Sequence, residues 1–207
     1  MRKLNYFVDL EKEEQWLNDM ARQGYILSRK SIGYEFEPAK PGLDVAIRID
    51  YRTFRRASDF EDYRALFEDC GWAHIAGTRS SGAQYFKKTG TDTEDDIFSD
   101  LDSKAGRYKR LADMWTSLAA CFIPLFVVLI TTNSIDLAVF LNPKALYYTP
   151  GLWEKEGAAF WGSFLFETPF ALGRGFLWMT IPIMIALASL FSYKAKKQYD
   201  SNRKPLS

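Results

Sequence analysis

Residues 114–135 form an unbroken run of 22 residues without Asp, Glu, Lys or Arg. A helix of about 20 apolar residues crosses the hydrocarbon core of a bilayer, so this run is long enough to span a membrane. A second uncharged run, of 19 residues, covers 175–193. The two runs predict a hairpin of transmembrane helices at 111–135 and 175–193.

Basic residues flank both predicted spans on the sides that lead to the chain termini. They are Arg107, Lys109 and Arg110 before the first span and Lys194, Lys196 and Lys197 after the second. The segment between the spans, 136–174, holds four acids and three bases. Because cytoplasmic flanks are rich in Lys and Arg, we predict a two-span protein with both termini in the cytoplasm, these six residues at the membrane interface, and a basic cytoplasmic tail at 194–207.

The N-terminus, MRKLNYFVDLEKEE, lacks the apolar run of a secretory signal, which agrees with a cytoplasmic front half.

Segment 136–174 is crowded with aromatic residues. They include Tyr147, Tyr148, Trp153, Phe160, Trp161, Phe164, Phe166 and Phe170. One interpretation is an interfacial belt, anchored by Trp153 and Trp161, in which residues 158–172 lie as a helix at the headgroup level. The alternative is a docking surface for an external peptide or a membrane partner.

Residues 1–88 have the pattern of a mixed α+β domain. Asp9 precedes a helical pattern that stops at Gly24, and Ser58 and Glu61 form a capping box before a second helix that stops at Gly71. Each helix is followed by two strand patterns. We predict two copies of a β-α-β-β unit, at 2–39 and 44–88, which build one antiparallel sheet with both helices on one face.

Charge is concentrated in the front half but is balanced there. Residues 1–110 hold 19 Lys and Arg against 20 Asp and Glu, so we expect no nucleic-acid partner. Residues 89–110 read as an acidic linker followed by a basic juxtamembrane helix. Glu94, Asp95, Asp96, Asp100 and Asp102 lack the spacing of an EF-hand calcium loop.

Residues 45–51 give the clearest strand pattern. Val45, Ile47, Ile49 and Tyr51 alternate with Arg48, Asp50 and Arg52. Glu35 and Glu37 are expected opposite the charged face. The five charged residues either form ion pairs across strands on a solvated face or line a groove that binds a small ligand or a partner's helix.

Catalytic and metal-binding patterns do not emerge from the sequence. The single histidine, His74, lacks a nucleophile or carboxylate at a recognisable spacing, and Cys70 and Cys121 are placed too differently to form a disulfide. We therefore expect no enzyme activity, no metal and no cofactor.

Several blocks in order, EKEEQWLNDMARQGY, YEFE, IDYR, YRALFEDCGW, QYFKK and IFSDLDSKAGRYKR, resemble the domain-of-unknown-function family DUF2812 over residues 4–112. The resemblance implies a bacterial protein, an α+β cytoplasmic domain tethered to a membrane hairpin, and a gene neighbour that encodes a PadR-type transcription regulator. It supplies no catalytic or binding residues. The element order also resembles the GyrI-like effector-binding domains, in which a ligand sits between the two copies.

Three functional hypotheses follow. The first is a non-enzymatic regulatory or sensory protein of the bacterial cell membrane, whose cytoplasmic domain binds a protein such as a PadR-type regulator. The second is a module that binds a small amphiphile between the two copies. The third is an accessory subunit that binds an integral membrane partner.

Overall fold

The computed structural model describes residues 1–42, 45–90 and 96–203. The predicted turn at 43–44, linker residues 91–95 (with Glu94 and Asp95) and tail residues 204–207 lie outside the described residues. The chain forms two compact units, which are described separately. One joins Met1–Met114 to Phe191–Ser207, and the other is Trp115–Leu190.

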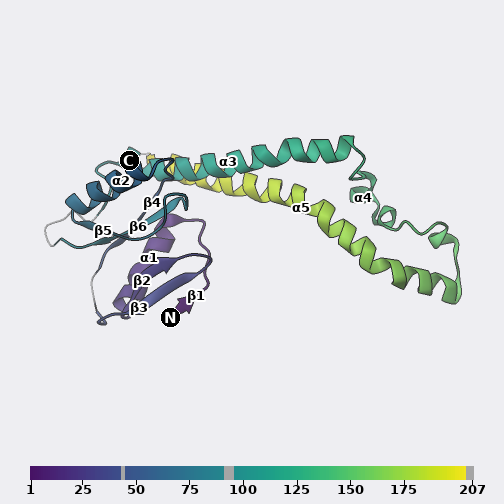
Figure 1. The fold of residues 1–207 in the computed structure, drawn as a ribbon, viewed down its shortest axis with the longest axis horizontal. Helices are drawn as coiled ribbons and strands as arrows, with labels where there is room; N and C mark the ends of the chain where they lie inside the picture. The colour runs from purple at the N-terminus through teal and green to yellow at the C-terminus, as the bar shows by residue number, and fades with distance from the viewer. Residues whose placement is uncertain (43–44, 91–95, 204–207) are drawn as a thin grey trace. The chain divides into compact units, whose positions relative to one another are not determined.

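The first unit contains six strands and two short helices, together with the ends of two long helices (Figure 1). In chain order its elements are β1 (Arg2–Lys3), α1 (Leu10–Arg22), β2 (Tyr25–Lys30), β3 (Tyr34–Pro38), β4 (Ile47–Tyr51), α2 (Ala57–Asp69), β5 (Trp72–Ala76) and β6 (Ala83–Lys88). The long helices are α3 (Leu101–Thr131) and α5 (Gly157–Arg203). The α+β class predicted from the sequence is confirmed.

The strands form two three-stranded antiparallel sheets, ordered β1-β3-β2 and β4-β6-β5. A single sheet was expected. Strands β2 and β5 lie close together, but each carries a register shift, at Leu27/Arg29 and at His74/Ala76. Such irregularities twist a strand locally, and among the described residues no ladder joins β2 to β5.

The two short helices pack on opposite faces of the second sheet, so the prediction that both cover one face is wrong. Successive residues of a strand point to opposite faces, as Tyr85 and Phe86 of β6 do. Tyr85 belongs to a core cluster with Leu17 and Met20 of α1, whereas Phe86 belongs to one with Tyr63 of α2. The alternation in strand β4 predicts one apolar face and does not reveal the second apolar layer, which lies under α2.

The larger core cluster fills the boundary between the two sheets. Its buried members are Leu10, Leu17, Met20, Leu27, Tyr34, Phe36, Ile47, Ile49, Ala76, Tyr85 and Tyr108. Because these residues come from both halves and from α3, they form one continuous packed core at the boundary where the sequence suggested a ligand groove.

The start of α3 and the end of α5 are part of the first unit. The Ser192 hydroxyl donates to the carbonyl of Ala112 at 3.2 Å, and Arg203 pairs with Asp102 at 3.3 Å. These contacts join residues early in α3 to residues late in α5, so the two helix ends run antiparallel within this unit.

The second unit contains the apolar parts of α3 and α5 with α4 (Ala138–Leu141), η1 (Pro143–Leu146) and η2 (Leu152–Glu154) between them. Within the described residues, α3 and α5 are the two helices long and apolar enough to cross a membrane, with mean hydropathies of 2.1 and 1.8 over their best windows. Only 6% of each window is buried, unlike the core helix of a soluble protein. These windows therefore present bare apolar surface.

The segment before the apolar part of α5 is tied to that helix by Glu167. This carboxylate accepts bonds from the backbone N–H groups of Tyr148 and Thr149, from the Thr149 hydroxyl, and from Arg174 at 2.9 Å. The Arg174 guanidinium also donates to the carbonyl of Leu146. The segment thus has a defined fold of its own.

Candidate functional site

Strand β4 is an edge strand whose outward backbone groups are covered by side chains from two helices. The Ile47 N–H donates to the Asn18 side chain at 2.7 Å, and the Ile49 N–H donates to Glu14 at 2.9 Å, both from α1. The Ile49 carbonyl accepts from Arg107 of α3 at 2.7 Å. An exposed strand edge can pair with another chain, and here these side chains satisfy its backbone hydrogen-bonding groups instead.

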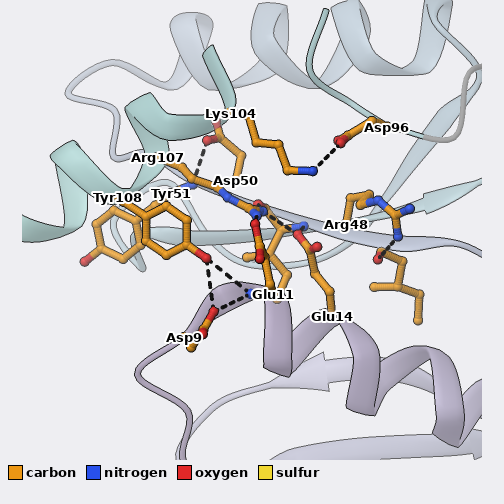
Figure 2. Close-up of polar contacts among 12 residues, drawn as sticks. Asp9, Glu11, Glu14, Arg48, Asp50, Tyr51, Asp96, Lys104, Arg107 and Tyr108 are labelled. Carbon is orange, nitrogen blue, oxygen red and sulfur yellow. Dashed lines mark hydrogen bonds and ion pairs between the residues drawn. The ribbon is translucent and has the colours of Figure 1, made fainter. Parts of the chain in front are cut away.

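Arg107 lies at the centre of this arrangement (Figure 2), and its side chain is fully buried. Its guanidinium forms an ion pair and hydrogen bond with Glu14, and it lies 3.7 Å from the carboxylate of Glu11. The ring centres of Phe98 and Tyr108 lie 5.3 and 5.1 Å from the Cζ atom of its guanidinium. A charge that is paired and hydrogen-bonded in this way is tolerated in a protein interior.

One turn further along α3, Arg110 makes a second link to β4. It donates to Asp50 at 2.5 Å and to the carbonyl of Tyr51 at 2.5 Å. Asp50 is buried and also accepts from the Tyr63 hydroxyl of α2 at 2.9 Å. Arg110 therefore connects α3 to the strand and, through Asp50, to the second helix of the domain.

Asp9 joins both long helices to the first turn of α1. It caps α1 by accepting from the Glu11 N–H at 3.0 Å, as the sequence predicted. It also accepts from the Tyr108 hydroxyl of α3 at 3.1 Å and from the Gln198 amide of α5 at 3.2 Å. Figure 2 shows the Asp9–Tyr108 contact beside Arg107. The Asp9 carboxylate thus contacts both long helices.

These contacts are called the anchoring network below. Its members are Asp9, Glu11, Glu14, Asp50, Arg107, Tyr108, Arg110 and Gln198. A further pair, Asp96 and Lys104 at 2.8 Å, holds the chain just before α3 against that helix.

Electrostatics in the network are dominated by burial and by pairing. Burial raises the pKa of Glu14, and the charge of Arg107 opposes that rise. Burial also raises the pKa of the adjacent Glu13, against hydrogen bonds from the hydroxyls of Tyr85 at 2.6 Å and Tyr34 at 2.7 Å. Burial, followed by the charge of Glu13, raises the pKa of both tyrosines well above the ordinary range.

The predicted interface residues divide between two environments. Arg107 was predicted at the membrane interface, and its side chain is buried in the domain, enclosed by Glu14 and two aromatic rings. Arg110 is partly exposed but paired with Asp50. Lys109, Lys194, Lys196 and Lys197 are exposed. A lysine stem on a helix surface reaches water, whereas the planar guanidinium of Arg107 matches the buried acid.

The predicted charged strand face is not assembled as expected. Glu35 and Glu37 lie on β3 of the first sheet, whereas Arg48 and Asp50 lie on β4 of the second. Arg48 donates to the carbonyl of its neighbour Ile47 at 3.1 Å. Arg52 is exposed over the rings of Phe54 and Tyr63. Of the five residues, Asp50 alone belongs to the anchoring network.

The aromatic segment of the second unit forms its own cluster. The ring centres of Trp153 and Tyr147 lie 5.3 Å apart, and those of Trp161 and Phe160 also lie 5.3 Å apart. Residues 158–172, expected as a separate interfacial helix, belong to the continuous helix α5.

His74 and the cysteines have ordinary surroundings. The His74 ring is 3.0 Å from the side-chain oxygen of Gln84 and packs on Phe60 and Phe86. Cys70 and Cys121 are free. In the portion of the chain that the structure describes, no group of three or more His, Cys, Asp or Glu side chains is arranged to hold a metal ion.

The fold and the network define an α+β domain whose core includes the ends of two membrane-length helices. The chain belongs to the family described as "Protein of unknown function (DUF2812)", whose sequence profile matches residues 9–120, more than half of the chain. This match includes α1, β4 and the α3 side of the anchoring network. Neither the curated proteins nor the solved structures contain a significant match to the chain.

Proposed function

We propose that this chain is a non-enzymatic regulatory or sensory protein of the bacterial cell membrane, in which two transmembrane helices control a cytoplasmic α+β domain. The single observation that carries this proposal is the convergence of both long helices on Asp9 through Tyr108 and Gln198. A simple tether needs only a linker, whereas these helices are built into the domain that they hold. The design suits the transmission of helix displacement to the domain.

Membrane insertion is supported by the bare apolar surface of α3 and α5. The best apolar window of each helix is 6% buried, and residues such as Val128, Phe176 and Leu190 are more than half exposed. An apolar surface of this length is stable in lipid and aggregates in water. The basic residues at 194–197 and Lys109 favour cytoplasmic termini, with the aromatic segment outside.

Transmission requires an element of the domain whose contacts break when a helix moves. The edge of β4 fits this role, because its Ile49 carbonyl and its Asp50 carboxylate depend on Arg107 and Arg110 of α3. Displacing α3 would leave a buried charge on Glu14 and unpaired groups on β4. These groups would disfavour the displaced arrangement, so a signal that moves α3 must stabilise that arrangement by a comparable free energy.

The output proposed is protein contact by the cytoplasmic domain, with a PadR-type regulator as the first partner to test. Most polar groups of the anchoring network hold one another, although Nε and Nη2 of the buried Arg107 have no hydrogen-bond partner, and His74 is engaged by Gln84 and two rings; these contacts support a mechanical role for these groups rather than a chemical one. The two β-α-β-β halves, which we interpret as copies, meet through a filled core. That packing gives the amphiphile-binding alternative less support than the regulatory one.

The test is affinity purification of the full-length protein in mild detergent through a C-terminal tag, followed by mass spectrometry. A soluble regulator that is recovered with the wild type, and whose recovery changes when Tyr108→Phe and Gln198→Ala are combined, supports the proposal. An integral membrane partner would favour the accessory-subunit alternative. A homomer together with unchanged transcription of neighbouring genes on deletion would contradict the regulatory role.

A further inference from the structure

One end of the α+β domain carries exposed apolar side chains that its own core leaves out. Leu4, Tyr6 and Ile32 are 75, 65 and 85% exposed. The tip of the β2–β3 hairpin touches the segment after β1, because a Cβ built at Gly33 would lie 2.9 Å from the Leu4 side chain. Leu4 and the hairpin tip that carries Ile32 therefore lie together at one end of the first sheet.

This end adjoins the point where the apolar stretch of α5 finishes. The rings of Tyr6 and Phe191 lie 6.0 Å apart, and Phe191 belongs to the last apolar residues before Lys194. An exposed tyrosine, Tyr193, follows two residues later. Aromatic residues followed by lysines mark the headgroup level of a cytoplasmic leaflet.

The second sheet brings basic loops to the same end. The Tyr51 carbonyl at the end of β4 accepts from Arg110 of α3 at 2.5 Å, and Ser192, which follows Phe191, donates to the carbonyl of Ala112 two residues further along α3, so the end of β4 lies near the Tyr6–Phe191 contact. The Arg52 N–H donates to the Gly82 carbonyl at 2.7 Å, and the Phe54 N–H donates to the Arg79 carbonyl at 2.9 Å. The loops at 52–56 and 78–82 therefore lie against each other beside Tyr51.

These two loops carry exposed arginines and no acid. The arginines are Arg52, Arg55, Arg56 and Arg79. Among the described residues, no ion pair joins any of them to an acid. Asp50, just before the first loop, is paired with Arg110, and the nearby Asp59 is outnumbered by Arg55 and Arg56.

We propose that this end of the domain is a second membrane-binding surface, which rests on the cytoplasmic leaflet and takes anionic phospholipid. The surface consists of Leu4, Tyr6, Ile32, Arg52, Arg55, Arg56 and Arg79, and is called the leaflet surface below. Its apolar residues enter the headgroup region and its arginines bind lipid phosphates. The occupant is a bilayer because the surface continues from the end of an apolar span and its unpaired charges are all positive.

The proposal rests on the membrane insertion proposed above and deepens it. If the leaflet surface binds lipid, the domain is held at the membrane at a second place besides the anchoring network. The composition and packing of the inner leaflet then act directly on the β2–β3 hairpin and on the end of β4. Anionic lipid would thereby be one input to the regulatory domain.

The experiment uses the full-length protein in vesicles, with Cys70→Ser and Cys121→Ser to remove the native thiols. Single cysteines introduced as Ile32→Cys, Leu66→Cys or Leu187→Cys carry an environment-sensitive fluorophore. Leu66 is the matched control, since it is an exposed leucine near the end of α2 (61% exposed), and Leu187 reports insertion of α5. Vesicles contain phosphatidylcholine with or without phosphatidylglycerol, plus a lipid quencher at headgroup depth.

We expect strong quenching at position 32 and little at position 66. Phosphatidylglycerol should increase the quenching at position 32, while raised salt, or Arg→Gln at positions 52, 55, 56 and 79 together, should reduce it. Equal quenching at 32 and 66, with position 187 protected inside the bilayer, would overturn the leaflet surface and leave membrane insertion standing. Exposure of position 187 to water would overturn both.

Discussion

Replacing Arg107 by methionine should destabilise the α+β domain far more than removing an exposed arginine. The substitution keeps much of the side-chain volume but leaves the buried Glu14 without its cation and the Ile49 carbonyl without its donor. Removing one partner of a buried pair costs about 3–5 kcal/mol. The orphaned carbonyl adds about 1 kcal/mol or more.

Arg22→Met is the matched control. Arg22 pairs with Asp19 at 2.9 Å on the surface of α1, where both side chains are more than half exposed. A pair of this kind contributes about 0–1 kcal/mol. The two arginine substitutions should therefore differ by roughly 3 kcal/mol or more, because Arg107 is buried against Glu14 and also lies 3.7 Å from Glu11, whereas Arg22 loses one exposed pair.

The assay is urea unfolding of the full-length protein in detergent micelles, monitored by tryptophan fluorescence, to which the buried Trp72 contributes, and by circular dichroism. Glu14→Gln combined with Arg107→Met should recover part of the loss, because the buried charge is removed together with its partner. Equal midpoints for Arg107→Met and Arg22→Met would refute the reasoning, since Arg107 would then be no more important than a surface charge.

Three further predictions concern single side chains. Asn18→Leu should lower the unfolding free energy by about 1–3 kcal/mol, because the Ile47 N–H at the edge of β4 loses its acceptor; an unchanged urea midpoint would argue against the edge covering. Burial raises the pKa of Glu13 in the folded state, so the contribution of Glu13 to stability should fall as pH rises from the ordinary pKa through the raised pKa. Glu13→Gln should flatten this pH dependence of the unfolding free energy in urea titrations, and parallel pH profiles of the two proteins would contradict this. Burial alone would raise the pKa of Glu167, but hydrogen bonds from Thr149, Tyr148 and Arg174 hold it at about 2, so the contribution of Glu167 should be present above the ordinary pKa and be lost as pH falls toward 2. Glu167→Gln should remove this acid sensitivity from hydrogen exchange of residues 148–149, and an unaltered profile would show that the carboxylate does not hold the segment.

Local rules predicted the elements of the first unit well, because each depends on neighbours in sequence. Asp9 caps α1, and Gly24, with φ of +88°, follows its last turn. The capping box at Ser58 and Glu61 did not form. Helix α2 begins at Ala57, so Ser58 is already inside it, and its hydroxyl donates to Asp59.

The division into two sheets could not be read from alternation, because it depends on irregular pairing at two places. Leu27/Arg29 shifts the register of β2 against β3 and His74/Ala76 shifts that of β5 against β6, while β2 and β5 do not pair with each other. The two faces of β4 were also misjudged, because Asp50 looks solvated in sequence but is covered by Tyr63. Contacts between distant segments decide such features, and a single sequence does not record them.

The anchoring network was missed for a related reason. Arg107 and Arg110 stand just before an apolar span, where the usual interpretation is a lipid-facing basic flank. Their spacing of three residues instead places both on the face of α3 that meets Asp50 and Glu14. The sequence offered one signal, because Glu13 and Glu14 are adjacent acids on an amphipathic helix. In the structure both side chains are buried.

The central claim is that displacement of the membrane helices reaches the edge of β4 through the anchoring network. The most direct measurement is hydrogen exchange of residues 47–51 in full-length protein, reconstituted into phosphatidylcholine vesicles of short and long acyl chains. Bilayer thickness changes the tilt of transmembrane helices, so exchange at Ile47 and Ile49 should differ between the two vesicles. The difference should shrink when Tyr108→Phe and Gln198→Ala are combined. Identical exchange in both bilayers for the wild type would contradict the claim.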